Sequence, residues 1–219
     1  MTPEAFLFDL NGTMIDDMEY HVKGWYEILN TDLQADLSWQ QVRAEMYGKN
    51  NEVLTRIFGE GKFTEARMNE LSMEKEKRYQ QSYLPHLKLI AGLEAFMDKA
   101  TANHIPMAIG SAAMMLNIDF VLDNLQLRNR FAAIVSADDV LISKPHPETY
   151  LKAAALLGVQ PHACIVFEDA PKGVEAAQNA GMKAVVLTTM HPQEDFAAYS
   201  NILVFVKDYE DPILNTLFE

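Results

Sequence analysis

The chain has 219 residues, of which 49% are hydrophobic and 22% charged, enough apolar material for one large domain or for one domain that carries an insertion. Its 31 acidic and 18 basic residues give a formal charge of −13, and this excess of negative charge disfavours nucleic acid and anionic membranes as partners. The single cysteine excludes an intrachain disulfide and a zinc site built from several cysteines, and it favours a reducing cytoplasmic location.

The first residues do not resemble a signal peptide, because they include no basic segment and because Glu4 and Asp9 interrupt the apolar run. No stretch contains the roughly 18 apolar residues that a membrane helix needs. We therefore expect a cytoplasmic protein with no membrane partner, either monomeric or weakly homo-oligomeric.

Short apolar segments recur along the chain with little polar alternation, which is typical of strands buried on both faces of a parallel sheet. We predict strands at Ala5–Phe8, Ile105–Ile109, Ala132–Val135, Ile165–Phe167, Ala184–Leu187 and Ile202–Val206. Between them, apolar residues three or four positions apart predict helices at Gly92–His104, Met114–Leu125, Pro147–Leu157 and Pro171–Ala180. The alternation predicts an α/β fold with a doubly wound, mostly parallel sheet.

The segment between the first two predicted strands has a different pattern. Residues 16–84 show helical periodicity with many charges, as in MEKEKRY at Met73–Tyr79, and no convincing strand. We interpret this segment as a small all-helical domain inserted into a core domain that comprises residues 1–15 and 85–219. The segments Asp16–Asp17 and Leu84–Pro85 would be its two linkers, close together because both connect to neighbouring strand ends.

Chemically reactive side chains follow several of the predicted strands. In an open parallel sheet, ligands bind beyond the carboxyl ends of the strands, and the residues found there are Asp9, Ser111, Lys144, Glu168 and Asp169. Three carboxylates, a hydroxyl and an ammonium group together suit a divalent cation and an anionic group, and oxygen ligands of this kind favour Mg²⁺ that also contacts a phosphate. The pattern therefore favours phosphate chemistry.

Four segments at these strand ends form an ordered set: FLFDLNGT at the first strand, IGSA at Ile109–Ala112, SKPHPETY at Ser143–Tyr150, and FEDAPKGVEAAQNAG at Phe167–Gly181. The set resembles the motifs of the haloacid dehalogenase superfamily. MEYHVKGW, at Met18–Trp25, further resembles the β-phosphoglucomutase-like branch, in which a small helical cap follows the first motif. The resemblance covers nearly the whole chain and implies a Rossmann-like core with an inserted cap.

This resemblance implies that Asp9 attacks phosphorus and forms an aspartyl phosphate, which divides one difficult displacement into two easier steps. It also implies a Mg²⁺ site made by Asp9, Asp169 and the backbone carbonyl of Asn11. Glu168 would be either a supporting ligand or a hydrogen-bond acceptor that does not itself contact the metal. Taken alone, Glu168 and Asp169 are also consistent with acids that stabilise the start of a helix near Pro171.

The other motif residues are implied to bind the phosphoryl group. Lys144 would neutralise its charge, while Thr13, Ser111 and backbone N–H groups, including that of Ala112, would bind its oxygens. Ser111 is equally suited to cap the helix that follows it, and the two roles are compatible.

Asn11 departs from the family pattern. Phosphatases and mutases of the family generally have a second aspartate there, which protonates the leaving oxygen and later activates water. An amide cannot exchange a proton in this way, and general acid–base catalysis contributes about 10²–10⁴ in rate. Three explanations stay open. Asn11 is an engineered replacement of aspartate, or the chain is a natural enzyme whose substrate has a good leaving group, such as an acyl phosphate, or it is a degenerate protein that binds its ligand without catalysis.

The predicted cap supplies further candidates for substrate binding. Mutases of this branch hold a distal phosphate with a cap arginine, and the matching position within GKNN (Gly48–Asn51) is Asn51, with Lys49 nearby. Lys75 matches the family's cap lysine and His21 lies at the start of the cap, so the resemblance implies that both contact substrate. The alternatives are a solvated helix face for Lys75 and a packing or capping role for His21.

These observations predict a Mg²⁺-dependent phosphatase that acts on a small phosphorylated metabolite, such as a sugar phosphate, through an aspartyl phosphate. Two alternatives stay open: a β-phosphoglucomutase-like phosphosugar mutase, against which the missing cap arginine counts, and a non-catalytic protein that binds a phosphorylated metabolite. A dehalogenase is disfavoured, because Thr13, Lys144 and the Glu168–Asp169 pair would then have no obvious role.

Overall fold

The computed structural model describes residues 3–219, which separate into two compact units. One unit contains the chain up to Asp16 together with Lys88–Glu219, and the other contains Asp17–Leu87. We call them the sheet unit and the helical unit. The sequence pattern places the second boundary between residues 84 and 85, whereas Leu84–His86 forms a 3₁₀ turn that continues the long helix of the helical unit.

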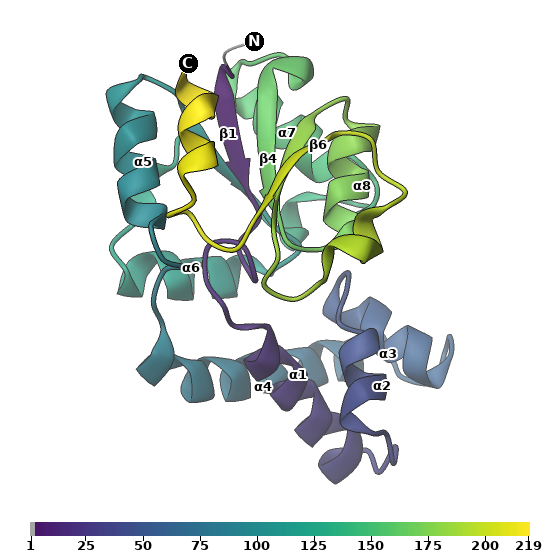
Figure 1. Ribbon diagram of the computed structural model, residues 1–219. Helices are drawn as coiled ribbons and strands as arrows, with labels where there is room; N and C mark the ends of the chain where they lie inside the picture. The colour runs from purple at the N-terminus through teal and green to yellow at the C-terminus, as the bar shows by residue number, and fades with distance from the viewer. Residues whose placement is uncertain (1–2) are drawn as a thin grey trace. The chain divides into compact units, whose positions relative to one another are not determined.

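The sheet unit is built on six parallel strands in the order β3-β2-β1-β4-β5-β6 (Figure 1). The strands are β1 (Ala5–Phe8), β2 (Met107–Gly110), β3 (Ala133–Val135), β4 (Cys164–Glu168), β5 (Lys183–Leu187) and β6 (Ile202–Val206). The chain proceeds outward from β1 to β3 and then returns to β4 on the other side of β1, which confirms the predicted doubly wound α/β fold. Ligands of such sheets bind where the winding direction reverses, here between β1 and β4.

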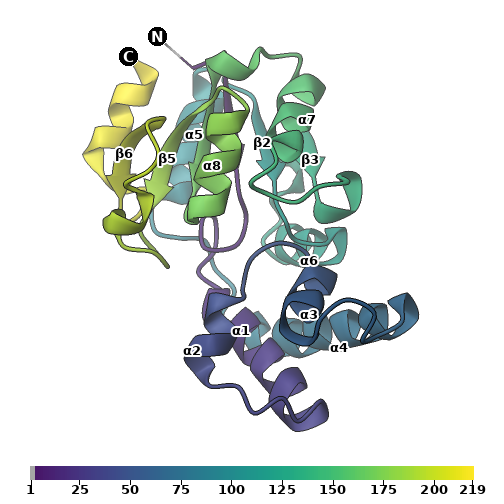
Figure 2. The same ribbon diagram turned by 90° about the vertical axis from the view of Figure 1, so that its right-hand side faces the viewer.

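Helices cover both faces of this sheet. They are α5 (Leu93–Ala102), α6 (Met115–Asn124), α7 (Glu148–Leu157) and α8 (Pro171–Asn179), with short 3₁₀ turns at Arg128–Arg130, Ala137–Asp139, Pro161–Ala163, Gln193–Phe196 and Pro212–Phe218. Figure 2 shows α7 and α8 in front of the sheet and α5 behind it.

The two faces bury different side chains, because successive residues of a strand point to opposite faces. Leu7 of β1 belongs to a mostly aliphatic cluster with residues of α7 and α8, among them Tyr150. Phe8 instead stacks on Phe167 of β4, with ring centroids 4.8 Å apart, and Phe167 contacts Phe96 of α5 at 5.1 Å. The strand beneath the site is therefore held by mostly aliphatic packing on one face and by an aromatic layer on the other.

The strand predicted at Ile105–Ile109 begins two residues later than its apolar pattern indicates. Ile105 is buried, but its N–H donates to the carbonyl of Ala100 at 3.0 Å and closes the end of α5. Pro106 has no N–H to contribute to a ladder, so β2 begins at Met107.

All regular elements of the helical unit are helical: α1 (Met18–Glu27), a π-helical turn (Ile28–Asp32), α2 (Trp39–Ala44), α3 (Asn50–Phe58), α4 (Glu65–Tyr83) and the 3₁₀ turn Leu84–His86. Ser38 caps α2 and Thr64 caps α4 through their side-chain oxygens. Trp25 and Leu54 lie in a small apolar core of their own. Within residues 3–219, the structure contains no helix long and apolar enough to span a membrane.

The two segments of the sheet unit that lead to the helical unit lie side by side. The N–H of Ile90 donates to the carbonyl of Met14 at 2.9 Å, and Ile15 pairs with Leu89 in an antiparallel bridge. The loop that follows β1 is thereby fixed at both ends, which matters because it carries the first candidate site residues.

Candidate active site

Three buried carboxylates meet at the carboxyl ends of β1 and β4. Asp9 directly follows β1, while Glu168 ends β4 and Asp169 follows it. Phe8 and Phe167 are partners in the parallel ladder, and the N–H of Asp9 donates to the carbonyl of Phe167 at 3.0 Å. This register places carboxylate oxygens of Asp9, Glu168 and Asp169 within 4.8 Å of one another.

Lys144 is the cation of this group and comes from the loop before α7. Its Nζ donates to Asp9 Oδ1 at 2.7 Å, to Glu168 Oε1 at 2.7 Å and to the Tyr150 hydroxyl at 2.8 Å. An ammonium group has three N–H donors, so these acceptors use all of them. Burial lowers the pKa of Lys144, but Asp9 and Glu168 more than offset this and raise the pKa to about 12. Lys144 is therefore charged at neutral pH.

Glu168 is held by four hydrogen bonds. Its Oε1 accepts from Lys144 and from the Tyr150 hydroxyl, each at 2.7 Å, and its Oε2 accepts from the N–H groups of Asp169 and Ala170, each at 3.0 Å. Four is about the number of bonds that an ionised carboxylate can accept. A Cβ at Gly173 in α8 would lie 1.7 Å from Oε1, so only glycine leaves room for this carboxylate.

The loop after β1 packs on Asp169. Thr13 Oγ1 donates to Asp169 Oδ1 at 3.3 Å, and Gly12 adopts a positive φ of 73°. A Cβ at Gly12 would lie 2.0 Å from Asp169 Oδ2, so the backbone approaches this carboxylate as closely as only glycine permits. Burial, and next the charges of Glu168 and Asp9, raise the pKa of Asp169 well above its usual value.

The charges of this cluster do not balance. One ammonium group faces three carboxylates, which leaves two negative charges in a buried site when all are ionised. Such an excess is costly in a medium of low dielectric constant, and the raised pKa of Asp169 reflects it. A divalent cation would cancel it, and oxygen donors of this type fit Mg²⁺.

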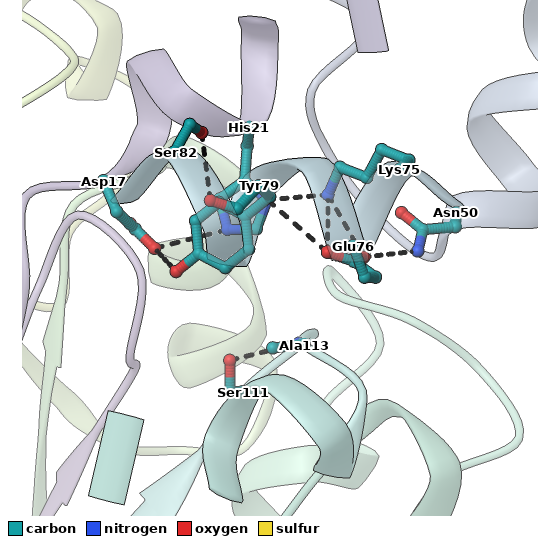
Figure 3. Close-up of polar contacts among 9 residues, drawn as sticks. All are labelled: Asp17, His21, Asn50, Lys75, Glu76, Tyr79, Ser82, Ser111 and Ala113. Atoms are coloured by element: carbon teal, nitrogen blue, oxygen red, sulfur yellow. Dashed lines mark hydrogen bonds and ion pairs between the residues drawn. The ribbon is translucent and has the colours of Figure 1, made fainter. Parts of the chain in front are cut away.

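Ser111 and Ala112, two other predicted phosphate-binding residues, follow β2, the neighbour of β1. The N–H of Ser111 donates to the carbonyl of Val135 at 2.9 Å, and its Oγ accepts from the N–H of Ala113 at 3.1 Å (Figure 3). Ser111 is buried and Ala112 is half-buried in the same turn. The serine oxygen thus stabilises the turn, but it does not cap α6, whose N-cap is Met114 and has no side-chain cap hydrogen bond.

Three residues near these groups were not among the predicted site residues. The Tyr150 hydroxyl contacts Lys144 and Glu168, Thr189 Oγ1 donates to the carbonyl of Gly12 at 2.6 Å, and the hydroxyl of Tyr209 donates to the carbonyl of Thr13 at 3.1 Å. Thr189 lies two residues after the end of β5, and this position near a strand end could have identified it as a candidate site residue. Tyr150 lies inside a motif, but Tyr209 has no local signal in the sequence.

In the helical unit, the structure brings together the two predicted substrate-binding residues His21 and Lys75, which are 54 positions apart. Lys75 Nζ lies 2.6 Å from His21 Nδ1 and 3.1 Å from both carboxylate oxygens of Glu76 (Figure 3). An ammonium group can only donate, so His21 Nδ1 is assigned as the acceptor. Lys75 is therefore a buried, paired cation and not part of a solvated helix face.

Further polar groups extend this helical-unit cluster, as Figure 3 shows. The other ring nitrogen of His21, Nε2, lies 3.2 Å from Asp17 Oδ2, which also accepts from the Tyr79 hydroxyl at 2.5 Å. Asn50 Nδ2 donates to Glu76 Oε1 at 2.6 Å. Burial, followed by the charge of Asp17, raises the pKa of Tyr79, so its phenol stays protonated. The cluster thus contains two buried carboxylates beside one lysine.

Comparisons with known proteins show which family this chain is similar to. Residues 6–187 match the family model described as "Haloacid dehalogenase-like hydrolase". The chain is 33% identical over 182 residues to fructose-1-phosphate phosphatase YqaB of Escherichia coli K12, covering 83% of this chain and 94% of that protein. It is 33% identical over 187 residues to the β-phosphoglucomutase of Bacillus subtilis, covering 83% and 82%. The crystal structure of β-phosphoglucomutase from Clostridium difficile superposes with a TM-score of 0.85 at 26% identity, covering 99% and 97%.

Proposed function

Because this chain belongs to the haloacid dehalogenase-like hydrolase family, we propose that it is a Mg²⁺-dependent phosphatase of small sugar phosphates and that Asp9 is its nucleophile. Family membership makes the chain an enzyme of the haloacid dehalogenase type. The observation that carries the finer proposal is the buried contact of 2.7 Å between Asp9 and Lys144 beside the carboxylates of Glu168 and Asp169.

The proposed reaction has two displacements at phosphorus. In the first, an Asp9 carboxylate oxygen forms a bond to phosphorus while the bond to the sugar oxygen breaks, and the released oxygen takes a proton from water. In the second, a water oxygen attacks phosphorus and the acyl phosphate bond breaks, which restores the Asp9 carboxylate and releases inorganic phosphate; the proton lost from this water neutralises the hydroxide left by the first step. Asn11 can hydrogen-bond in this site but cannot supply the proton, which predicts slow release of a poor leaving group.

The ligands proposed for Mg²⁺ are the carboxylates of Asp9 and Asp169 and the backbone carbonyl of Asn11. Bound Mg²⁺ would supply positive charge to the phosphoryl oxygens. Glu168 is better assigned as a supporting residue, because its two oxygens already accept four hydrogen bonds within the protein. The close approach of the Gly12 backbone to Asp169 supports this choice, since it holds the Asp9 loop against the second carboxylate.

The phosphoryl group itself would be bound by this chain's own donors. Lys144 is buried and charged, so it can neutralise an incoming phosphoryl group at short range. We assign the remaining oxygens to Thr13, to Ser111 and to the backbone N–H of Ala112, as the family resemblance implies. All three lie in loops that follow β1 or β2.

The helical unit supports a substrate with one phosphate. We assign substrate contacts to His21 and Lys75, but the Lys75 ammonium is already paired with Glu76, and Asp17 adds a further carboxylate. Asn51, in the first turn of α3, carries no charge at the position where mutases of this branch have an arginine. The lysine that a second phosphate would meet among the described residues of this cluster is therefore already paired with a carboxylate, whereas sugar hydroxyls suit the polar groups of the cluster.

A panel of sugar monophosphates with Mg²⁺, assayed for released phosphate, tests the proposal. The parent protein should hydrolyse at least one ester and form an acid-stable phosphoenzyme with acetyl phosphate, and Asp9→Asn should do neither. Asp119→Asn, at a surface ion pair with Arg128, is the matched control and should behave like the parent. Turnover that survives Asp9→Asn would exclude the mechanism.

A phosphosugar mutase is the second candidate, because the chain resembles the β-phosphoglucomutases of Bacillus subtilis and Clostridium difficile. The discriminating assay supplies β-glucose 1-phosphate with a bisphosphate activator and separates glucose 6-phosphate from free phosphate. Release of phosphate without the isomer supports the phosphatase, and isomer formation supports the mutase. Tight binding of sugar phosphates without turnover, even in the Asn11→Asp protein, would instead indicate the non-catalytic binder.

A further inference from the structure

The hydroxyl of Tyr150 joins two groups of the site that the proposed chemistry treats separately. It accepts a hydrogen bond from Lys144 Nζ at 2.8 Å and donates one to Glu168 Oε1 at 2.7 Å. Lys144 Nζ also lies 4.6 Å from the centroid of the Tyr150 ring. The tyrosine is fully buried, so the positions of these three polar groups depend on one another.

The position of the Tyr150 ring is set by close packing against β2. A Cβ at Gly110 would lie 3.0 Å and 3.1 Å from two carbons of the ring, closer than ordinary van der Waals contact. Glycine at the end of β2 therefore gives the ring its place, and α7, which carries Tyr150, packs on β1, β2 and β3. The hydroxyl is thus held by the framework of the sheet and not by a flexible loop.

The three acceptors of Lys144 respond differently to a phosphoryl group on Asp9. Asp9 loses its negative charge when its carboxylate becomes an acyl phosphate, so its hold on the ammonium weakens. Glu168 keeps its place through the N–H groups of Asp169 and Ala170. The Tyr150 hydroxyl takes no part in the bond changes. Two N–H groups of Lys144 therefore stay engaged, and the third remains directed at Asp9.

We propose that Tyr150 is a positioning residue, whose hydroxyl holds Lys144 and Glu168 so that one N–H of Lys144 points at the phosphoryl group on Asp9. This inference rests on the proposed function, because it requires a phosphoryl group at Asp9. Tyr150 does not touch the reacting atoms and acts through Lys144. Its loss should therefore affect the stabilisation of the phosphorylated state more than the binding of the sugar.

Tyr150→Phe removes the hydroxyl and keeps the ring, and Tyr199→Phe removes a hydroxyl that lies 3.4 Å from Glu175, in a half-buried position. With the best sugar phosphate and with acetyl phosphate, Tyr150→Phe should lower kcat about tenfold and leave KM nearly unchanged, as the loss of one hydrogen bond predicts. The affinity for beryllium fluoride with Mg²⁺, a mimic of the aspartyl phosphate, should fall to a similar extent. Tyr199→Phe should change neither quantity.

A double-mutant cycle separates positioning from general stability. If the hydroxyl acts through Lys144, Tyr150→Phe should weaken beryllium fluoride binding in the parent protein but add almost nothing in a Lys144→Met background. Gly110→Ala, which keeps the hydroxyl but displaces the ring, is the second variant and should lower kcat in the same way. It also keeps the test open if Tyr150→Phe does not fold.

The positioning role would be overturned if both Tyr150→Phe and Gly110→Ala had the same kcat and the same affinity for beryllium fluoride as the parent protein. A rise in KM at constant kcat, or an equal loss of affinity with and without Lys144, would overturn it as well. The proposed function fails in a different way: neither the parent nor the Asn11→Asp protein would then form a phosphoenzyme, and the positioning role would fall with it.

Discussion

Lys144 Nζ lies 2.7 Å from Asp9 Oδ1, although the two residues are 135 positions apart in the chain. Through this contact and its bond to Glu168, Lys144 places a buried positive charge against two of the three clustered carboxylates. Its loss leaves buried negative charge uncompensated, which typically costs about 3–5 kcal/mol. We expect Lys144→Met to lower the free energy of unfolding by this order in EDTA, measured by urea denaturation, and Mg²⁺ to restore part of the loss.

Lys172→Met is the matched control for this experiment, because Lys172 forms an exposed ion pair with Glu175 in α8. Exposed pairs of this kind contribute little to stability. An equal loss in the two variants, or no recovery with Mg²⁺ in Lys144→Met, would contradict the charge balance derived for the site.

Two buried helical glycines should respond differently to alanine. A Cβ at Gly173 would overlap Glu168 Oε1 at 1.7 Å, whereas a Cβ at Gly24 in α1 would meet Lys75 atoms no closer than 3.4 Å, which is ordinary contact. We expect Gly24→Ala to leave the free energy of unfolding unchanged or to raise it by up to about 1 kcal/mol through helix propensity.

Gly173→Ala should destabilise the protein and weaken Mg²⁺ binding, because Glu168 must leave its four hydrogen bonds. Thermal unfolding and calorimetric Mg²⁺ titration measure both effects, and similar behaviour of the two variants would count against the role of Glu168.

The sequence predicts the sheet well because burial on both faces leaves a simple pattern. The apolar runs at Ala5–Phe8 and Ile202–Val206 match β1 and β6 at both ends, and the residues that follow strands identify Asp9 and Asp169 as neighbours. The start of β2 is predicted too early because Ile105 is buried for another reason: it closes the helix before the strand. An apolar pattern reports burial, and only hydrogen bonding distinguishes a strand from a helix end.

The hydrogen-bond partners of the site are harder to predict than its charged residues. Tyr150 belongs to an apolar helix face in the sequence, and nothing local indicates that its hydroxyl joins Lys144 to Glu168. In the helical unit, His21 and Lys75 are individually recognisable, but their contact and the pairing of Lys75 with Glu76 depend on how α1 packs on α4. Tertiary packing determines these contacts, so one sequence alone does not contain a readable signal for them.

Mg²⁺ should stabilise the protein more strongly at neutral than at acid pH. The pKa of Asp169 is raised well above its usual value of 3.8, so the folded protein retains a proton that the unfolded chain releases. The contribution of this group to stability is therefore present at low pH and is lost as pH rises towards the folded-state pKa. A cation competes with this proton and removes the penalty, so its stabilising effect should grow with pH.

The measurement compares Tm in EDTA and in saturating Mg²⁺ between about pH 5 and pH 8, where a cation at 100 times its Kd stabilises by about 2.7 kcal/mol. The Mg²⁺-dependent rise in Tm should increase across this range in the parent and be nearly absent in Asp169→Asn. A rise that does not depend on pH, or one that persists in Asp169→Asn, would place the cation elsewhere.

Asn11→Asp should convert the protein into a faster phosphatase. The substituted carboxyl group can protonate the leaving sugar oxygen and then activate water, so kcat for a sugar phosphate should rise by about 10²–10⁴. Acetyl phosphate has a good leaving group that needs little protonation, so the step that releases acetate should gain much less. Burst kinetics separate this step from hydrolysis of the phosphoenzyme. Asn124→Asp, at an exposed asparagine whose amide donates to the carbonyl of Phe120, is the matched control and should change neither rate.

An equal gain in the release step for both substrates would argue against a role of residue 11 in leaving-group protonation. No gain for either substrate would favour a protein that binds its ligand without turning it over.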